Sequence, residues 1–140
     1  AKITVTDKCA ANGEKCMVNV EKVDCPTDEP QPLNFKFSGQ GKALEAIDTA
    51  DMHVVARFAG VKLLDKSLSA CGEQTIELPA GAGSITLDLL DCPVADQAEF
   101  SILCSVAATQ KLPFGKLDIE ISAADSSSNK LLYLEVLVQA

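Results

Sequence analysis

Apolar and polar residues alternate one by one along parts of this chain, and this period of two is the feature that most constrains its fold. The contrast is sharpest over residues 33–38, 52–59 and 116–123. Successive side chains of a β-strand point to opposite faces of a sheet, so each segment predicts a strand with one buried and one solvated face. Weaker patterns predict further strands at residues 18–23, 85–89, 100–104 and 131–138.

Turn-forming residues such as Asn12–Gly13, Gly81–Ala82–Gly83 and Pro113–Phe114–Gly115 separate the predicted strands. Seven or eight short antiparallel strands with regular turns are typical of a sandwich or a barrel. Each sheet has one apolar face that must be covered, which favours an all-β, immunoglobulin-like sandwich of two sheets. With 140 residues, the chain is expected to form a single domain over residues 1–140.

Charge and histidine content argue against several functions. The net charge is −8, and no basic stripe with interleaved aromatics is present, so we expect no nucleic-acid partner and a soluble monomer. A catalytic triad or a multi-histidine metal site needs histidine, and the single one, His53, falls on a predicted solvated face. Asp88 and Asp91 are expected on a solvated face or turn. We therefore expect no enzyme activity, cofactor or metal; a small secreted hydrolase is the enzyme alternative.

Six cysteines, at positions 9, 16, 25, 71, 92 and 104, lack the Cys-x-x-Cys spacing of zinc sites. Cysteines at this density predict disulfides, and therefore secretion or a lysosomal or endosomal lumen.

Several short motifs follow one another in a characteristic order. They are Asp7–Lys8–Cys9 with Val18–Asn19–Val20; Asp24–Cys25–Pro26–Thr27; Gly60–Val61 with Cys71; Cys92–Pro93 with Phe100–Ser101 and Leu112–Pro113; and Asp125 with Asn129–Lys130–Leu131–Leu132 and Leu134–Glu135–Val136–Leu137–Val138–Gln139. In this order they resemble the ML lipid-recognition family, which includes the Niemann–Pick type C cholesterol carrier, the mite group 2 allergens and the ganglioside activator. The resemblance runs over residues 7–139.

The resemblance implies an apolar pocket between the sheets, whereas alternation alone favours a filled core. The residues expected to line it are Val54, Ala56, Phe58, Leu87, Leu89, Phe100, Ile102, Leu117, Ile119, Ile121 and Tyr133. It also implies a pocket mouth formed by two loops, with an apolar rim of Val61, Leu63, Leu64, Leu112, Pro113 and Phe114. Tyr133 takes the place of a last-strand cysteine that the family usually has.

The family's middle bridge implies a Cys71–Cys92 disulfide. The remaining four cysteines allow three pairings. Cys9 and Cys16 lie equally far from Asn12–Gly13, and a two-residue hairpin there would place them opposite each other. That arrangement favours Cys9–Cys16 and leaves Cys25 with Cys104, without excluding the other pairings.

These features together predict a secreted carrier that holds a fatty acyl lipid, phospholipid or sterol between two β-sheets. Four lysines, Lys62, Lys66, Lys111 and Lys116, flank the rim segments and are expected to hold the mouth transiently against an anionic membrane. The alternatives are a ligand-free recognition or adhesion module and an accessory protein that presents lipid to an enzyme or receptor.

Overall fold

The computed structural model describes residues 2–11, 13, 16–24, 34–78, 83–108 and 116–139. Within them the chain forms ten strands and one short helix. In chain order these are β1 (Lys2–Asp7), α1 (Lys8–Ala11), β2 (Val18–Asp24), β3 (Asn34–Lys42), β4 (Ala50–Phe58), β5 (Val61–Ser69), β6 (Glu73–Glu77), β7 (Gly83–Asp88), β8 (Glu99–Ala108), β9 (Lys116–Asp125) and β10 (Lys130–Gln139).

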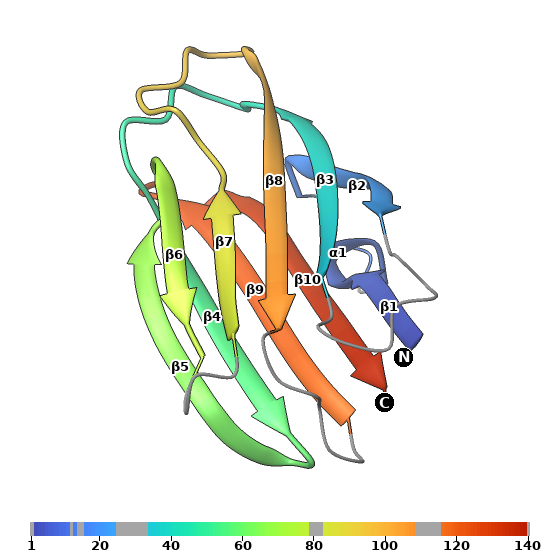
Figure 1. Cartoon of the computed structure of the whole chain (residues 1–140). Coiled ribbons are helices and arrows are strands. Elements are labelled where there is room, and N and C mark those ends of the chain that lie inside the picture. The colour runs from blue at the N-terminus through green and yellow to red at the C-terminus, as the bar shows by residue number, and fades with distance from the viewer. Residues whose placement is uncertain are drawn as a thin grey trace.

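The strands form two five-stranded sheets, ordered β1-β10-β9-β4-β5 and β2-β3-β8-β7-β6. Paired strands are antiparallel throughout both sheets. Figure 1 shows two layers, with β5 and β6 at one side of the sandwich and β1 and β2 at the other. The predicted all-β, two-sheet sandwich is confirmed, although its strands outnumber the seven or eight expected.

Alternation along the inner strands produces the core. On β4, Met52, Val54 and Ala56 are 2%, 0% and 0% exposed. Asp51 and His53, on either side of Met52, are exposed. The buried side chains of both sheets join in one hydrophobic cluster. This cluster lies between the layers, because the inner faces of paired antiparallel sheets must cover each other.

Three strands, β1, β5 and β6, were not predicted, and all three are sheet edges. Within β5, Leu64 is the buried residue and most others are exposed, so the strand carries little alternation. Residues 61–64, expected in a loop, belong to β5 instead. The chain turns before them at Ala59 and Gly60, whose φ angles are 49° and 83°.

Two disulfides were predicted correctly: Cys9–Cys16 and Cys71–Cys92. The first begins in helix α1 and not in the expected hairpin strand. The Cys25–Cys104 pairing was wrong, because Cys104 is a free, buried thiol. It lies on β8 between Phe37 and Leu87, in the core, and burial raises the pKa of this thiol. Cys25 lies outside the described residues.

Candidate functional site

The inner faces of the two sheets bring together most of the residues predicted to line a pocket. Those buried in the shared core are Val54, Ala56, Leu64, Leu87, Leu89, Ile102, Leu117, Ile119 and Ile121. They come from five strands of the two sheets and the residue after β7, and each is at most 8% exposed. The sequence therefore located this apolar interior correctly.

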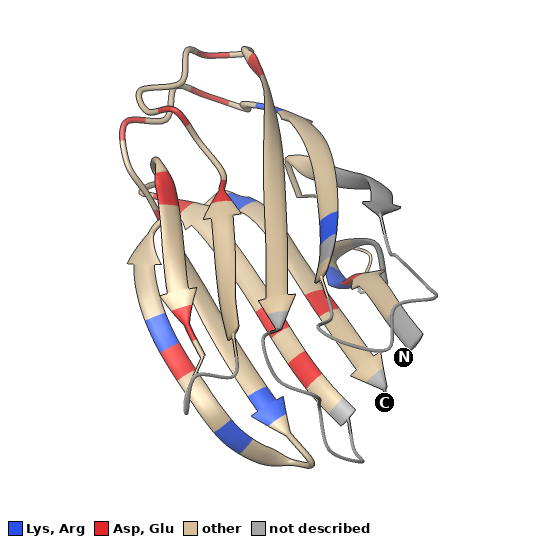
Figure 2. Ribbon diagram, viewed as in Figure 1, with Lys and Arg blue, Asp and Glu red and all other residues tan. Residues whose placement is uncertain are grey.

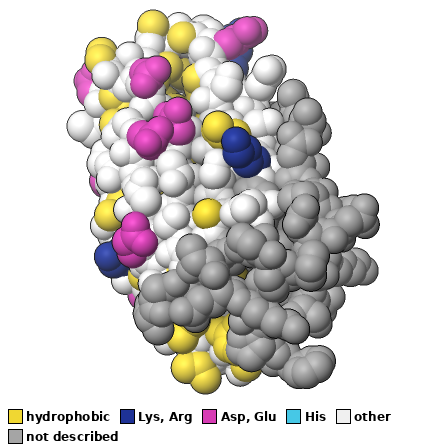
Figure 3. Space-filling view, in the orientation of Figure 1, with side chains coloured by type: hydrophobic (Ala, Val, Ile, Leu, Met, Phe, Trp, Pro, Cys, Tyr) yellow, Lys and Arg dark blue, Asp and Glu magenta, His cyan; other side chains and the backbone are white. Residues whose placement is uncertain are grey.

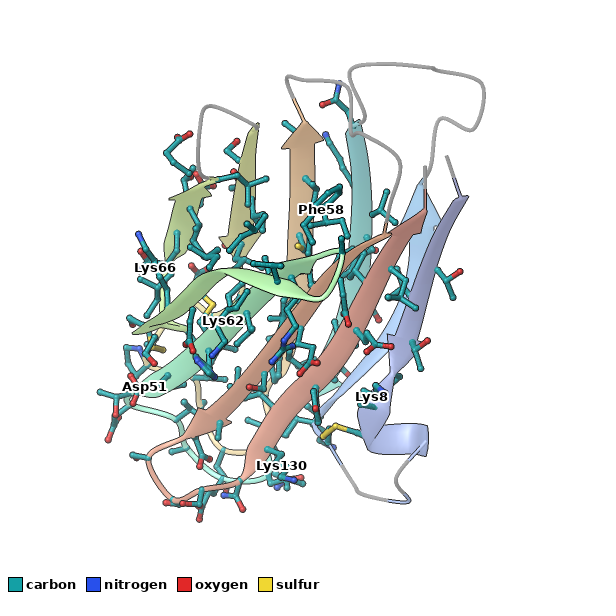
Figure 4. The ribbon with its side chains drawn as sticks, turned by 90° about the horizontal axis from the view of Figure 1, so that it is seen from below. Lys8, Asp51, Phe58, Lys62, Lys66 and Lys130 are labelled. Carbon is teal, nitrogen blue, oxygen red and sulfur yellow. A yellow bond between two sulfur atoms is a disulfide. The ribbon has the colours of Figure 1, made fainter. Side chains whose placement is uncertain are left out.

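Two phenylalanines mark opposite ends of the interior. Phe58 is the last residue of β4 and Phe100 the second residue of β8, and both are half-buried against the core. Figure 4 shows Phe58 between the two sheets. The side chain of Phe58 is therefore partly accessible to solvent at this end.

The two sheets are joined unequally along their sides. Close backbone approaches between the layers gather where β2 meets β1 and β10. The described residues of β5 and β6, the edge strands on the opposite side, show no comparable run of approaches. We call the β1–β2 side the closed side and the β5–β6 side the open side. On the open side the layers are joined near one end, where Gly72 N–H donates to Leu90 O at 2.6 Å and Leu90 N–H donates to Ala70 O at 3.1 Å.

The predicted rim is partly described. Val61 and Leu63, at the start of β5, are 63% and 43% exposed, whereas Leu64 beside them is buried. Exposed apolar side chains next to the half-buried Phe58 form an apolar edge at this end of the molecule. Leu112, Pro113 and Phe114 lie outside the described residues.

Tyr133 does not lie between the sheets. It alternates along β10 with the buried Leu132 and Leu134, and its register partner is Ser122 of β9. Its hydroxyl lies 3.5 Å from Glu120 Oε2, with which it forms a hydrogen bond. The prediction that Tyr133 lines the pocket was wrong, because the pleat turns it to the outer face.

The two lysines of the predicted collar whose side chains the structure describes lie on opposite faces of β5. Lys62 Nζ lies 3.0 Å from Asp65 Oδ2, in an ion pair on the outer face. Lys66 is in register with the buried Val54 and so projects to the inner face. Lys111 lies outside the described residues, and the side chain of Lys116 is not described.

An open groove of about 1020 Å³ crosses the outer face of β10, β9, β4 and β5, and sequence reasoning missed it. His53 lies in the groove and hydrogen-bonds Asp65 through Nε2, as an exposed pair. The hydrogen bonds from His53 and Lys62 lower the pKa of Asp65. Ser67 and Ser122 are the register partners of His53. Within the described chain, no hydrogen bond joins Ser67 or Ser122 to the imidazole ring of His53. These residues therefore do not form an assembled triad.

Beside the groove, three carboxylates cluster on β9 and β10. One oxygen each of Asp118, Glu120 and Glu135 lie within 4.8 Å of one another, and Figure 2 shows the acidic positions along these strands. Two cations balance part of this charge. Arg57 Nη1 lies 3.1 Å from Glu120 Oε1, and Lys8 Nζ lies 3.7 Å from Glu135 Oε1. The register across β4, β9 and β10 assembles this cluster, and spacing alone does not reveal it.

Fold and interior together define an immunoglobulin-like β-sandwich with an apolar interior that is less tightly joined along one side. The chain belongs to the ML domain family, whose model matches residues 4–139. This family membership confirms the resemblance inferred from the ordered motifs.

Three relatives place the chain within this class. It is 26% identical over 125 residues to the phosphatidylglycerol/phosphatidylinositol transfer protein of Mycosarcoma maydis, covering 88% of this chain and 60% of that protein's length. A crystal structure of chicken MD-1 complexed with lipid IVa superposes with a TM-score of 0.54 at 12% identity, covering 98% of this chain and 88% of that one. The crystal structure of a Niemann-Pick type C2 protein from the Japanese carpenter ant superposes with a TM-score of 0.53 at 10% identity. The match covers 88% of this chain and 92% of that one.

Proposed function

We propose that this ML domain is a lipid carrier that holds the apolar part of a fatty acyl lipid, phospholipid or sterol between its two sheets. The observation that carries the proposal is the continuous apolar core to which both inner faces contribute. The names of the relatives agree with it: one is a phosphatidylglycerol/phosphatidylinositol transfer protein, and another was crystallised with lipid IVa.

The driving force for uptake is removal of apolar ligand surface from water, at about 25 cal/mol per Å². Aliphatic side chains such as Val54, Leu87 and Ile119 provide the walls, and the solvent-accessible end at Phe58 offers an entry point. Little polar chemistry is required for such transfer, so we infer that the chain is a carrier and not an enzyme. The pair formed by His53 and Asp65 remains on the outer face, away from this interior.

We also propose a transient contact with an anionic membrane at the end of the sandwich that carries Val61 and Leu63. These two apolar side chains are the part of the predicted rim that the structure describes. Of the two predicted lysines whose side chains the structure describes, Lys62 is paired with Asp65 and Lys66 has no acidic partner among the described residues. Liposome binding that does not change with vesicle charge or salt would contradict this contact.

The cysteine chemistry supports a secretory or lysosomal location for the protein. Cys9–Cys16 and Cys71–Cys92 are bridged, and such bridges persist in oxidising compartments. None of the described residues belongs to a helix that is long and apolar enough to cross a membrane.

A ligand-free recognition module is the second candidate. Such a module needs a surface for its partner, and Figure 3 shows the outer face of the second sheet dominated by uncharged polar groups and backbone among its described residues. Leu103, an apolar side chain on that face, is 42% exposed. This face offers a weaker candidate site than the interior does.

Uptake of a fluorescent fatty acid or phospholipid tests the proposal. Phe58→Asp is expected to reduce uptake at least about tenfold, because a carboxylate at the entrance would have to be desolvated by the guest. Leu103→Asp, on the outer face of the other sheet, is the matched control and is expected to bind as the wild type does. Circular dichroism would establish that both variants fold.

Native mass spectrometry of the purified protein provides the complementary measurement. A carrier is expected to retain lipid that organic solvent can extract. A wild-type protein that neither retains nor takes up lipid would instead support the recognition module.

A further inference from the structure

An exposed charged side chain projects from the inner face of the edge strand β5. Lys66 lies on β5 opposite Val54 of β4. Directly opposed residues of an antiparallel pair project to the same face, and Val54 is 0% exposed. Figure 4 shows Lys66 on the side of β5 that faces β6, and Lys62 on the other side of the same strand.

The charge of Lys66 is uncompensated within the described chain. Several other basic residues are engaged, in the pairs Lys62–Asp65, Arg57–Glu120 and Lys8–Glu135. Acidic residues on the facing edge strand β6 do not approach it from the inner side. Glu73 and Glu77 alternate with the buried Ile76 and are exposed, so they point to the outer face.

Apolar groups surround the base of Lys66. Leu64 and Leu68, two residues away on either side, are buried and partly buried against the core. On β6, Gln74 is in register with the buried Leu87 and therefore adds an amide to the inner face. The edge of the interior thus carries one cation at the boundary between water and hydrocarbon-like side chains.

We propose that Lys66 binds the anionic oxygens of a lipid headgroup, a phosphate or a carboxylate, while the lipid's apolar chains lie between the sheets. The inference rests on the proposed carrier function and adds to it a ligand class and a selecting residue. An ammonium provides three donors to such oxygens and can reach them on a flexible stem. The competing explanation is that an inward-pointing lysine protects an edge strand from pairing with another chain.

The test compares Lys66→Gln with Lys62→Gln, which removes the same charge from the opposite face of the same strand. Each variant is titrated with fluorescent phosphatidylglycerol, phosphatidylcholine and a fatty acid that share one labelled chain. Wild-type protein is expected to prefer the two anionic lipids. Lys66→Gln is expected to weaken their binding about fivefold, as for a solvent-exposed charged contact, and to leave the binding of phosphatidylcholine unchanged. Lys62→Gln and Lys66→Arg are both expected to keep the wild-type preference for the two anionic lipids.

Salt is expected to reduce the preference of the wild type and not that of Lys66→Gln. Equal binding of all three lipids by wild type and Lys66→Gln would overturn the headgroup assignment and leave the carrier function standing. Unchanged selectivity with new oligomers of Lys66→Gln would assign the lysine to edge protection. Displacement of lipid by inorganic phosphate alone would assign it to free anions. A wild type that takes up no lipid would overturn both proposals.

Discussion

Asp118 is the acidic residue whose charge the fold accommodates least well. Its Oδ1 atom is buried and has no hydrogen-bond partner among the described residues. Partial burial, followed by the nearby carboxylates of Glu135 and Glu120, raises the pKa of Asp118, and Arg57 and Lys8 oppose this shift. The ionised carboxylate of Asp118 on β9 therefore destabilises the folded protein.

Removing this charge is expected to stabilise the protein at neutral pH. Because the folded-state pKa of Asp118 lies above its unfolded value of 3.8, the stability contributed by its protonation is present below that value and is lost as the pH rises through the folded-state pKa. Asp118→Asn should raise the free energy of unfolding by about 0.5 kcal/mol at neutral pH, the scale of one unfavourable cross-strand charge pair.

Chemical denaturation over a range of pH measures this effect. The gain of Asp118→Asn should shrink as the pH falls toward the ordinary pKa of an aspartate. Asp51→Asn, an exposed position on β4 opposite Ala124, is the control for loss of one acidic charge. Equal gains in the two variants would show that net charge, and not the carboxylate cluster, sets the stability.

The hairpin between β9 and β10 depends on a single carboxylate. Asp125 is 8% exposed, and its Oδ1 accepts hydrogen bonds from the backbone N–H groups of Ser127 and Asn129, both at 2.9 Å. Asn129 Nδ2 donates to Asp125 Oδ2 at 3.1 Å and to Glu45 Oε1 at 2.7 Å. The turn is thereby tied both to the end of β9 and to the segment before β4.

Asp125→Ala is expected to lower the free energy of unfolding by about 2 kcal/mol, because two backbone donors of the turn lose a charged acceptor. Urea denaturation measures the loss. Ser126→Ala changes an exposed neighbour in the same turn and should have little effect. An Asp125→Ala protein as stable as Ser126→Ala would show that the turn forms without these hydrogen bonds.

Inner strands were predictable from the sequence because they have one buried and one solvated face, as Met52, Val54 and Ala56 show on β4. The edge strands β1, β5 and β6 were not, since a strand with one neighbour needs little alternation. The sequence also did not reveal which face of β5 carries Lys62 and which carries Lys66, because the strand is irregular. A register shift separates the pairs Ala56–Leu64 and Arg57–Lys62, and one extra residue turns the rest of a strand to the opposite face. Lys62 and Lys66, four apart in sequence, consequently lie on opposite faces.

As a whole, the molecule joins its two sheets differently along its two sides. The closed side combines the close approach of β2 to β1 and β10 with the Cys9–Cys16 bridge. On the open side, the Cys71–Cys92 bridge lies near one end, after β5 and before β8. A guest between the sheets would therefore displace the least packing along β5 and β6.

Hydrogen exchange of lipid-loaded and delipidated protein tests this asymmetry. Loading is expected to slow amide exchange in β5 and β6 about fivefold or more, because edges that open locally become closed by the guest. Strands β1 and β10 should change little, since their packing already limits opening. Protection confined to β1, β2 and β10 would place the guest at the closed side and contradict entry along β5 and β6. Protection spread evenly over both sheets would show that loading tightens the whole sandwich without preference for an edge.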